Sequence, residues 1–142
     1  MAQEIAGLVP VSKDEVVLLL EAGYLYMDMG KWDEARDVFT GAAALLPRSE
    51  VPQLALGTLE FAQGKHDKAL QAYRKAQQIA PKSGLPRAHA GEALLFMGKP
   101  AEAEKELKSA IDLEPEGDGA KLARALLDAK QSGALPPGKK AR

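Results

Sequence analysis

The sequence contains no cysteine, few aromatic residues and no excess of charge of either sign. Without cysteine, the chain cannot form a disulfide scaffold, a thiol nucleophile, an iron–sulfur cluster or a cysteine-ligated zinc site. The 19 basic and 20 acidic residues leave a formal net charge of −1. No overall electrostatic field therefore attracts nucleic acid or an anionic membrane.

Long apolar runs are also absent. No stretch of 18 or more apolar residues occurs, which predicts that no helix of this chain spans a bilayer. Residues 1–10 lack the basic start and the apolar core of a signal peptide. We therefore expect a cytoplasmic protein with no membrane span.

Residues that favour β-strands are scarce. The chain has only 11 β-branched residues and 5% aromatic residues, against 25 alanines among its 142 residues. Strands favour β-branched and aromatic side chains, whereas alanine is the best helix former. A chain of this length can bury a core of its own. The composition therefore predicts one all-α domain with closely packed helices.

The strongest positive signal is a repeat with a period of 34 residues. Self-similarity at such a period is typical of helical repeat proteins. The columns that share this spacing are Gly23, Gly57 and Gly91; Gly30, Gly64 and Gly98; Ala35, Ala69 and Ala103; Phe39, Tyr73 and Leu107; Ala42, Ala76 and Ala110; and Pro47, Pro81 and Pro115.

These columns predict three pairs of helices and one further helix. Proline ends a helix, and glycine tolerates the left-handed conformation that follows one. A glycine inside a helix costs about 1 kcal/mol relative to alanine, and the close approach of a second helix can offset this cost. The predicted helices cover residues 13–29, 32–46, 50–63, 66–80, 85–97, 100–114 and 118–131.

The predicted helix starts carry recognisable signals. Ser12 and Glu15 have the spacing of a capping box, and Asp118 is a predicted N-cap. Prolines fall in three predicted first turns, where the missing N–H is tolerated: Pro52, Pro86 and Pro100.

In the residues of these columns, the sequence resembles the tetratricopeptide repeat (TPR) family. The family pattern runs W-x2-L-G-x2-Y and then A, F, A and P over 34 residues. Repeats at 16–49, 50–83 and 84–117 match its spacing, although Leu19, Gln53 and Arg87 replace the opening aromatic residue. The resemblance implies a right-handed α-solenoid of three helix–turn–helix units, closed by a capping helix at 118–131. The expected divisions are an N-terminal extension at 1–12, a TPR domain at 13–131 and a flexible basic tail at 132–142.

By the same resemblance, a partner peptide lies along a concave groove formed by the first helix of each repeat. Most positions facing this predicted groove are apolar, which suits an apolar or amphipathic segment of a partner. Alternatively, several of these side chains pack on neighbouring helices or are covered by residues 1–12. The predicted groove residues are Val17, Leu20, Tyr24, Met27, Val51, Leu54, Thr58, Phe61, Leu85, Ala88, His89, Glu92 and Phe96.

Two uses of TPR grooves differ in the residues that they need. Members that hold the acidic C-terminus of heat-shock chaperones use lysine or arginine together with asparagine. This chain has no asparagine and almost no basic residue at the groove positions, so that activity is not expected.

Its size, repeat number and apolar groove are similar to those of bacterial type III secretion chaperones, which hold apolar segments of translocator or needle subunits in the cytosol. Translocator chaperones dimerise through a longer N-terminal helix than residues 1–12 can provide.

We therefore expect a protein–protein interaction module whose partner is a protein or peptide client. A cytosolic secretion chaperone is the more specific interpretation. The alternative is a structural adaptor that joins proteins within a larger assembly through either face. The sequence leaves both a monomer and a homodimer open.

No residue pattern predicts an enzyme, and we expect no catalytic residue, metal site or cofactor. The chain has no G-x-S-x-G, P-loop or G-x-G-x-x-G motif. His66 is expected to be a solvated turn residue. His89 is expected to project toward the predicted groove beside Glu92, and this pair supplies too few ligands for a metal ion. No stripe of basic and aromatic residues predicts nucleic-acid binding.

Overall fold

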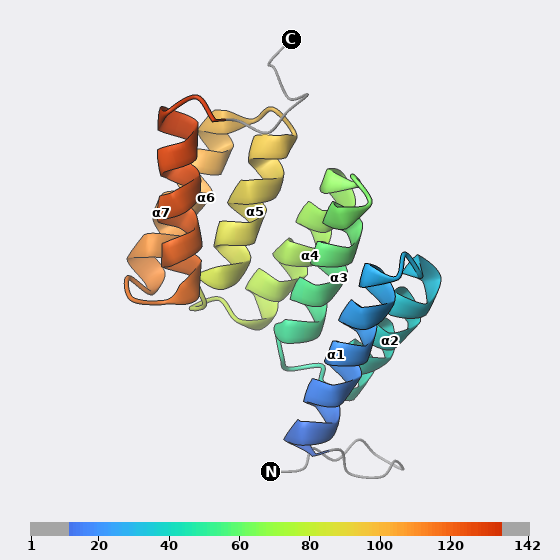
Figure 1. Ribbon diagram of the computed structural model, residues 1–142. Helices are drawn as coiled ribbons and strands as arrows, with labels where there is room; N and C mark the ends of the chain where they lie inside the picture. Colours follow the sequence, from blue (N-terminus) through green and yellow to red (C-terminus); the bar gives the residue numbers. More distant parts are fainter. Residues whose placement is uncertain (1–11, 135–142) are drawn as a thin grey trace.

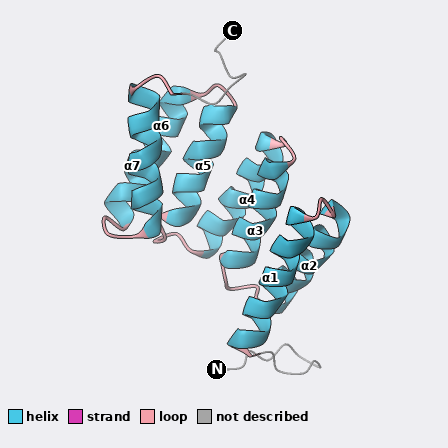
Figure 2. Ribbon diagram, viewed as in Figure 1, coloured by secondary structure: helices cyan, strands magenta, loops and turns pink. Residues whose placement is uncertain are grey.

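The computed structural model describes residues 12–134, and within this range the chain forms seven helices and no strand (Figure 1, Figure 2). Each predicted helix is present, and its ends lie within one residue of the predicted ends. The predicted extension at 1–12 and tail at 132–142 lie outside the described residues, apart from Ser12 and residues 132–134. The helices are α1 (Lys13–Asp28), α2 (Trp32–Leu45), α3 (Val51–Ala62), α4 (His66–Ile79), α5 (Leu85–Phe96), α6 (Pro100–Leu113) and α7 (Asp118–Gln131).

Local signals account for several helix ends. The Ser12 hydroxyl accepts a hydrogen bond from the Glu15 backbone N–H, and the Glu15 carboxylate accepts one from the Ser12 N–H, which confirms the capping box. The first helix of each repeat is followed by a glycine with positive φ, a conformation that glycine adopts without steric cost. These glycines are Gly30 (φ 71°), Gly64 (φ 75°) and Gly98 (φ 73°).

The predicted N-cap of the last helix is wrong by one residue. Gly117 is the N-cap of α7, with an extended backbone at φ −80° and ψ 167°, and Asp118 is the first helical residue. An acidic side chain in the first turn still interacts favourably with the positive end of the helix dipole. The same carboxylate therefore marks this helix start without accepting the capping hydrogen bond.

The helices are arranged in two layers. In Figure 1, α1, α3 and α5 lie toward the viewer, and α2, α4 and α6 lie behind them. Helices that are neighbours in sequence contact each other, and α7 contacts both α5 and α6. The chain is therefore an all-α solenoid, as predicted.

Three interior glycines allow the two layers to approach closely. A Cβ atom at Gly57 would overlap the Tyr73 ring, so the ring or the helix would have to shift to accommodate it. Gly23 faces Phe39 in the first repeat, and Gly91 faces Leu107 in the third, at similarly short distances. Tyr73, Phe39 and Leu107 are fully buried. Each repeat is thus closed by a large side chain of its second helix that occupies the space left by a glycine of its first helix.

Helix α7 closes the C-terminal end of the array. The Arg124 guanidinium donates a hydrogen bond to the Pro115 carbonyl oxygen over 2.9 Å, and the Lys130 ammonium lies 2.6 Å from a carboxylate oxygen of Glu104 on α6. Lys130 is half-buried against α6. Together with Lys108, it lowers the pKa of Glu104 to about 2.

We predict that Gly57→Ala destabilises the protein by about 1–3 kcal/mol, because the added methyl group overlaps the Tyr73 ring and overpacks the core. Gly41→Ala is the matched control, since Gly41 lies in α2, is exposed and has nothing within 4 Å of an added Cβ. That change should stabilise the helix by about 0.5–1 kcal/mol. Urea denaturation measures both. Equal effects of the two substitutions would contradict the packing role of Gly57.

We also predict that the Glu104 carboxylate titrates with a pKa of about 2 in an NMR pH titration. Because its pKa is lowered from the ordinary value of 4.5, its pairs with Lys108 and Lys130 stabilise the fold above about pH 4.5 and are lost as the pH falls through about 2. Lys130→Met should raise this pKa. Lys121→Met, on the same helix but paired with Asp118, should leave it unchanged, and the reverse result would refute the assignment.

Candidate functional site

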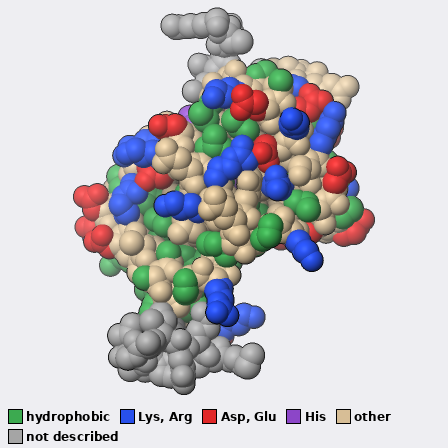
Figure 3. Space-filling model, turned by 180° about the vertical axis from the view of Figure 1, so that it is seen from behind, with side chains coloured by type: hydrophobic (Ala, Val, Ile, Leu, Met, Phe, Trp, Pro, Cys, Tyr) green, Lys and Arg blue, Asp and Glu red, His purple; other side chains and the backbone are tan. Residues whose placement is uncertain are grey.

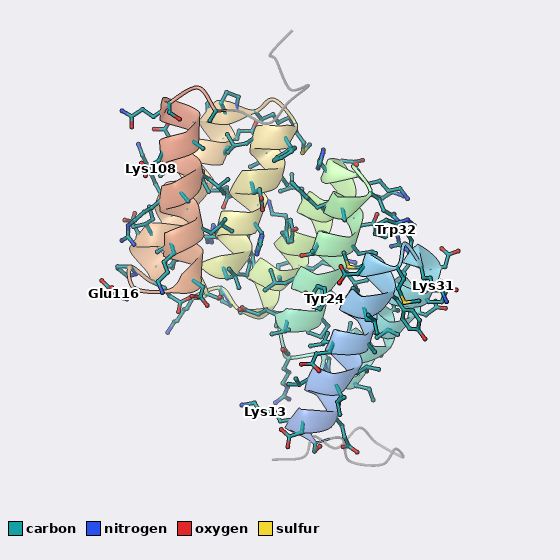
Figure 4. The ribbon with its side chains drawn as sticks, viewed as in Figure 1. Lys13, Tyr24, Lys31, Trp32, Lys108 and Glu116 are labelled. Atoms are coloured by element: carbon teal, nitrogen blue, oxygen red, sulfur yellow. The ribbon has the colours of Figure 1, made fainter. Side chains whose placement is uncertain are left out.

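The predicted groove residues lie on α1, α3 and α5, the layer nearest the viewer in Figure 1. Tyr24, labelled in Figure 4, lies on α1 next to α3. Val17, Tyr24 and Val51 are exposed to 50%, 41% and 45%. Half-buried side chains make up most of the remaining predicted groove residues: Leu20, Met27, Thr58, Phe61, Leu85, His89, Glu92 and Phe96.

Two predicted groove residues belong to the core instead. Leu54 is 7% exposed and packs with Tyr73, and Ala88 is fully buried in the cluster around Leu107. Their side chains offer a ligand little or no surface. The alternative that some groove positions pack on neighbouring helices therefore applies to these two.

An aromatic cluster lies where the C-terminal ends of α3 and α5 meet the start of α4. The Phe61 and Phe96 rings contact edge to face, with centroids 4.8 Å apart, and the His66 ring lies 4.7 Å from Phe61 and 5.1 Å from Phe96. His66 is the first residue of α4 and is half-buried. Its prediction as a solvated turn residue is wrong, because the next repeat brings Phe96 against it.

A second cluster joins α4 to α5. The His89 ring stacks on Tyr73 with centroids 5.2 Å apart, and its Nδ1 lies 3.4 Å from a carboxylate oxygen of Glu92. The predicted pairing of His89 with Glu92 is confirmed. Burial raises the pKa of Tyr73 above its ordinary value, although a hydrogen bond with Thr58 acts in the opposite direction. Burial also raises the pKa of Tyr24.

The charge of the predicted groove is low. Glu92 is the one carboxylate among its residues, and none of them is lysine or arginine. Among residues 12–134, no group of three or more His, Asp or Glu side chains is placed to hold a metal ion. In the same range, no helix is long and apolar enough to cross a membrane. The chemistry that these positions offer is contact with apolar and aromatic surface.

Sequence reasoning missed a cavity lined by charged and apolar side chains outside the predicted groove, here called the rear pocket. It lies between α2, α3 and α4 and has a volume of about 390 Å³, with Arg36, Glu60, Lys68 and Lys75 in its lining. Arg36 forms an ion pair with Glu60, which is only 7% exposed. In the view from behind, Lys and Arg side chains cross the middle of the face (Figure 3). None of these residues recurs at the 34-residue period, so the repeat gave no signal for the pocket.

Comparisons with known proteins agree with this architecture. Two family models described as tetratricopeptide repeat match residues 20–84 and 60–127. No curated protein matches the sequence.

Several solved structures share the fold. The type III secretion translocator chaperone SycD of Yersinia enterocolitica is 27% identical, with a TM-score of 0.73 over 83% of this chain and 91% of SycD. SycD in complex with a peptide of the translocator YopD is 26% identical, with a TM-score of 0.70 over 87% of this chain and 97% of that one. PcrH in complex with the chaperone binding region of PopD gives 26% identity and a TM-score of 0.70 over 87% and 96% of the two chains.

We predict that Tyr73→Phe weakens the alkaline pH dependence of stability. Because burial raises the pKa of Tyr73 above 10.0, its contribution is fully present below the unfolded pKa and is lost as the pH rises through the folded pKa. The free energy of unfolding of the unmodified chain should fall from about pH 9 to about pH 11, and that of Tyr73→Phe should fall less. Urea denaturation across this range measures both, and identical slopes would show that Tyr73 ionises freely in the folded chain.

Proposed function

The chain belongs to the tetratricopeptide repeat family, and we propose that it binds an apolar or amphipathic segment of a partner protein along the predicted groove. The observation that carries this proposal is the exposure of large apolar side chains on the first helices, Val17 and Tyr24 on α1 and Val51 on α3. Water-exposed apolar surface of this kind on one layer of a solenoid favours contact with a partner. With no cation at the groove positions, the binding energy comes from apolar burial.

The partner is proposed to be a secretion substrate held before export. Support comes from the likeness to SycD and PcrH, whose structures contain a peptide of the translocator YopD and the chaperone binding region of PopD. The likeness covers 87% of this chain and nearly all of the others. On this proposal the chain acts in the cytoplasm, shields an aggregation-prone segment and catalyses no reaction.

A structural adaptor is the second candidate, and the rear pocket favours it. None of the predicted groove residues lines this cavity, and Arg36, Lys68 and Lys75 give it cations that the groove positions lack, so the solenoid offers a second surface of different chemistry. An adaptor would bind two folded partners at once and would not need to rescue either from aggregation. The two candidates therefore differ in the state of the partner as well as in the face used.

We predict that Val51→Glu and Tyr24→Ala each weaken client binding by tenfold or more, which corresponds to about 1.4 kcal/mol. Val51 is 45% exposed, so the loss in Val51→Glu arises at the interface. The Tyr24 ring also contacts the buried Phe39 ring, with centroids 5.1 Å apart, so urea denaturation of Tyr24→Ala separates lost binding from lost stability. Leu113→Glu is the matched control, because Leu113 is 37% exposed and lies on α6, outside the predicted groove.

The measurement has two stages. Mass spectrometry first identifies the proteins that purify with the tagged chain, and titration calorimetry then compares the variants against that client. A secretion-apparatus subunit whose binding is lost in both groove variants and kept in Leu113→Glu supports the chaperone. Folded partners that bind all variants equally would rule out the groove and favour the adaptor.

A further inference from the structure

The even overall balance of charge conceals a local excess of positive charge on α4. Residues 65–82, which contain α4 and its flanking turns, hold one acid, Asp67, against five basic residues: Lys65, Lys68, Arg74, Lys75 and Lys82. Arg74 is paired with Glu106 on α6. Within residues 12–134, by contrast, no carboxylate forms an ion pair with Lys68 or Lys75. Both lysines are exposed and line the rear pocket, so this cavity holds positive charge that the described part of the chain leaves uncompensated.

The one carboxylate in the lining of the rear pocket is already engaged. Glu60 pairs with Arg36, whose guanidinium also lies 3.5 Å from the side-chain oxygen of Gln63. The lining thus sets three cations, Arg36, Lys68 and Lys75, against this single acid. A ligand that enters the pocket meets a net positive charge, which favours an anionic partner.

The uncharged lining suits a peptide better than a bare ion. Thr40, Gln53 and Gln71 form no side-chain hydrogen bond with another residue in the described range, and their side chains can bond to the N–H and C=O groups of a peptide backbone. The rest of the lining is apolar and consists of Ala43, Leu56 and Ala72. The cavity of about 390 Å³ therefore offers a peptide segment charged, hydrogen-bonding and apolar contacts together.

The cations lie toward both ends of the rear pocket. Short turns reverse the chain between α2 and α3 and again between α3 and α4, so α2 and α4 run in the same direction (Figure 1). Arg36 and Lys68 are both near the starts of their helices and lie toward one end of the pocket, whereas Lys75 lies toward the other. Lys68 and Lys75 are two helical turns apart on one side of α4, which corresponds to about 10 Å.

We propose that the rear pocket binds an extended acidic segment of a partner protein, with one carboxylate held by Arg36 and Lys68 and a second by Lys75. In the polyproline II conformation, residues three apart lie on the same side of the segment at about 9 Å, which matches the spacing of the two lysines. The sequence that fits is a pair of Asp or Glu residues separated by two small or proline residues, whose apolar surface contacts Leu56. This inference gives the second candidate function a partner of defined chemistry, and it stands whether or not the predicted groove binds a client.

The charge beside the pocket favours a short acidic peptide over nucleic acid. Asp33, Glu34 and Asp37 lie on α2 close to Arg36, and all three are exposed. A nucleic-acid strand carries a phosphate on every nucleotide, and the phosphates that extend past the pocket would meet these carboxylates. A peptide with two acids places its negative charge at the cations alone.

An NMR titration of the full-length chain tests the proposal with a capped peptide that contains Glu-Pro-Ala-Glu and with its Gln-Pro-Ala-Gln counterpart. The acidic peptide should shift the amide signals around Arg36, Lys68 and Lys75, and these shifts should weaken as salt is added. The neutral peptide should leave the same signals in place. No shift with the acidic peptide, equal shifts with both peptides, or shifts confined to other helices would overturn the proposal.

Two double variants that remove the same charge separate the pocket from the general field of α4. Lys68→Gln with Lys75→Gln should raise the dissociation constant of the acidic peptide about tenfold. Lys65→Gln with Lys82→Gln changes two exposed lysines outside the pocket lining, and it should leave this constant nearly unchanged. Urea denaturation should give both variants the midpoint of the unmodified chain. Equal losses of binding in the two variants would show that the pocket is not the site.

Further titrations distinguish other occupants and the predicted groove. A single-stranded oligothymidylate and inorganic phosphate are titrated under the same conditions, and both should bind more weakly than the acidic peptide. Tighter binding of the oligonucleotide, or equal binding of phosphate alone, would overturn the proposal. Val51→Glu, which alters the predicted groove, should leave binding of the acidic peptide unchanged, so a failure of the rear pocket is distinguishable from a failure of the groove. Loss of peptide binding in Val51→Glu would place the peptide in the groove and refute the pocket.

Discussion

The close approach of two helices at an interior glycine is the constraint on which the rest of the structure depends. Gly23, Gly57 and Gly91 each leave space that a large side chain of the following helix fills. A glycine inside a helix costs about 0.5–1 kcal/mol relative to alanine, whereas full burial of Phe39 or Leu107 contributes about 1.5–3 kcal/mol. Burial therefore outweighs the glycine cost in every repeat. Because this contact recurs every 34 residues, the two helices of each repeat pack against each other at the same position.

This packing determines which surfaces remain for partners. The second helices direct their large side chains into the first helices, so the opposite sides of α1, α3 and α5 are left to form the predicted groove. Ion pairs join the repeats elsewhere, such as Arg36 with Glu60 and Arg74 with Glu106.

The 34-residue columns predicted the helices and the close approach of helices at the interior glycines, and the spacing of Ser12 and Glu15 predicted the capping box. The repeat columns did not predict the environment of His66. That environment depends on the packing of the third repeat against the second, which brings the Phe96 ring into contact with His66. Nor did the columns show that Leu54 and Ala88 are buried, since burial depends on the angle between successive repeats. The rear pocket, built from non-repeating residues, gave no signal at all.

The central claim is that partners bind to the layer formed by α1, α3 and α5. Hydrogen exchange of the backbone amides, compared between the free chain and the chain purified with its client, tests it most directly. The account predicts that protection gained on binding is concentrated in α1, α3 and α5, with little change in α2, α4 and α6. Protection gained mainly in α2 and α4, around the rear pocket, would contradict it.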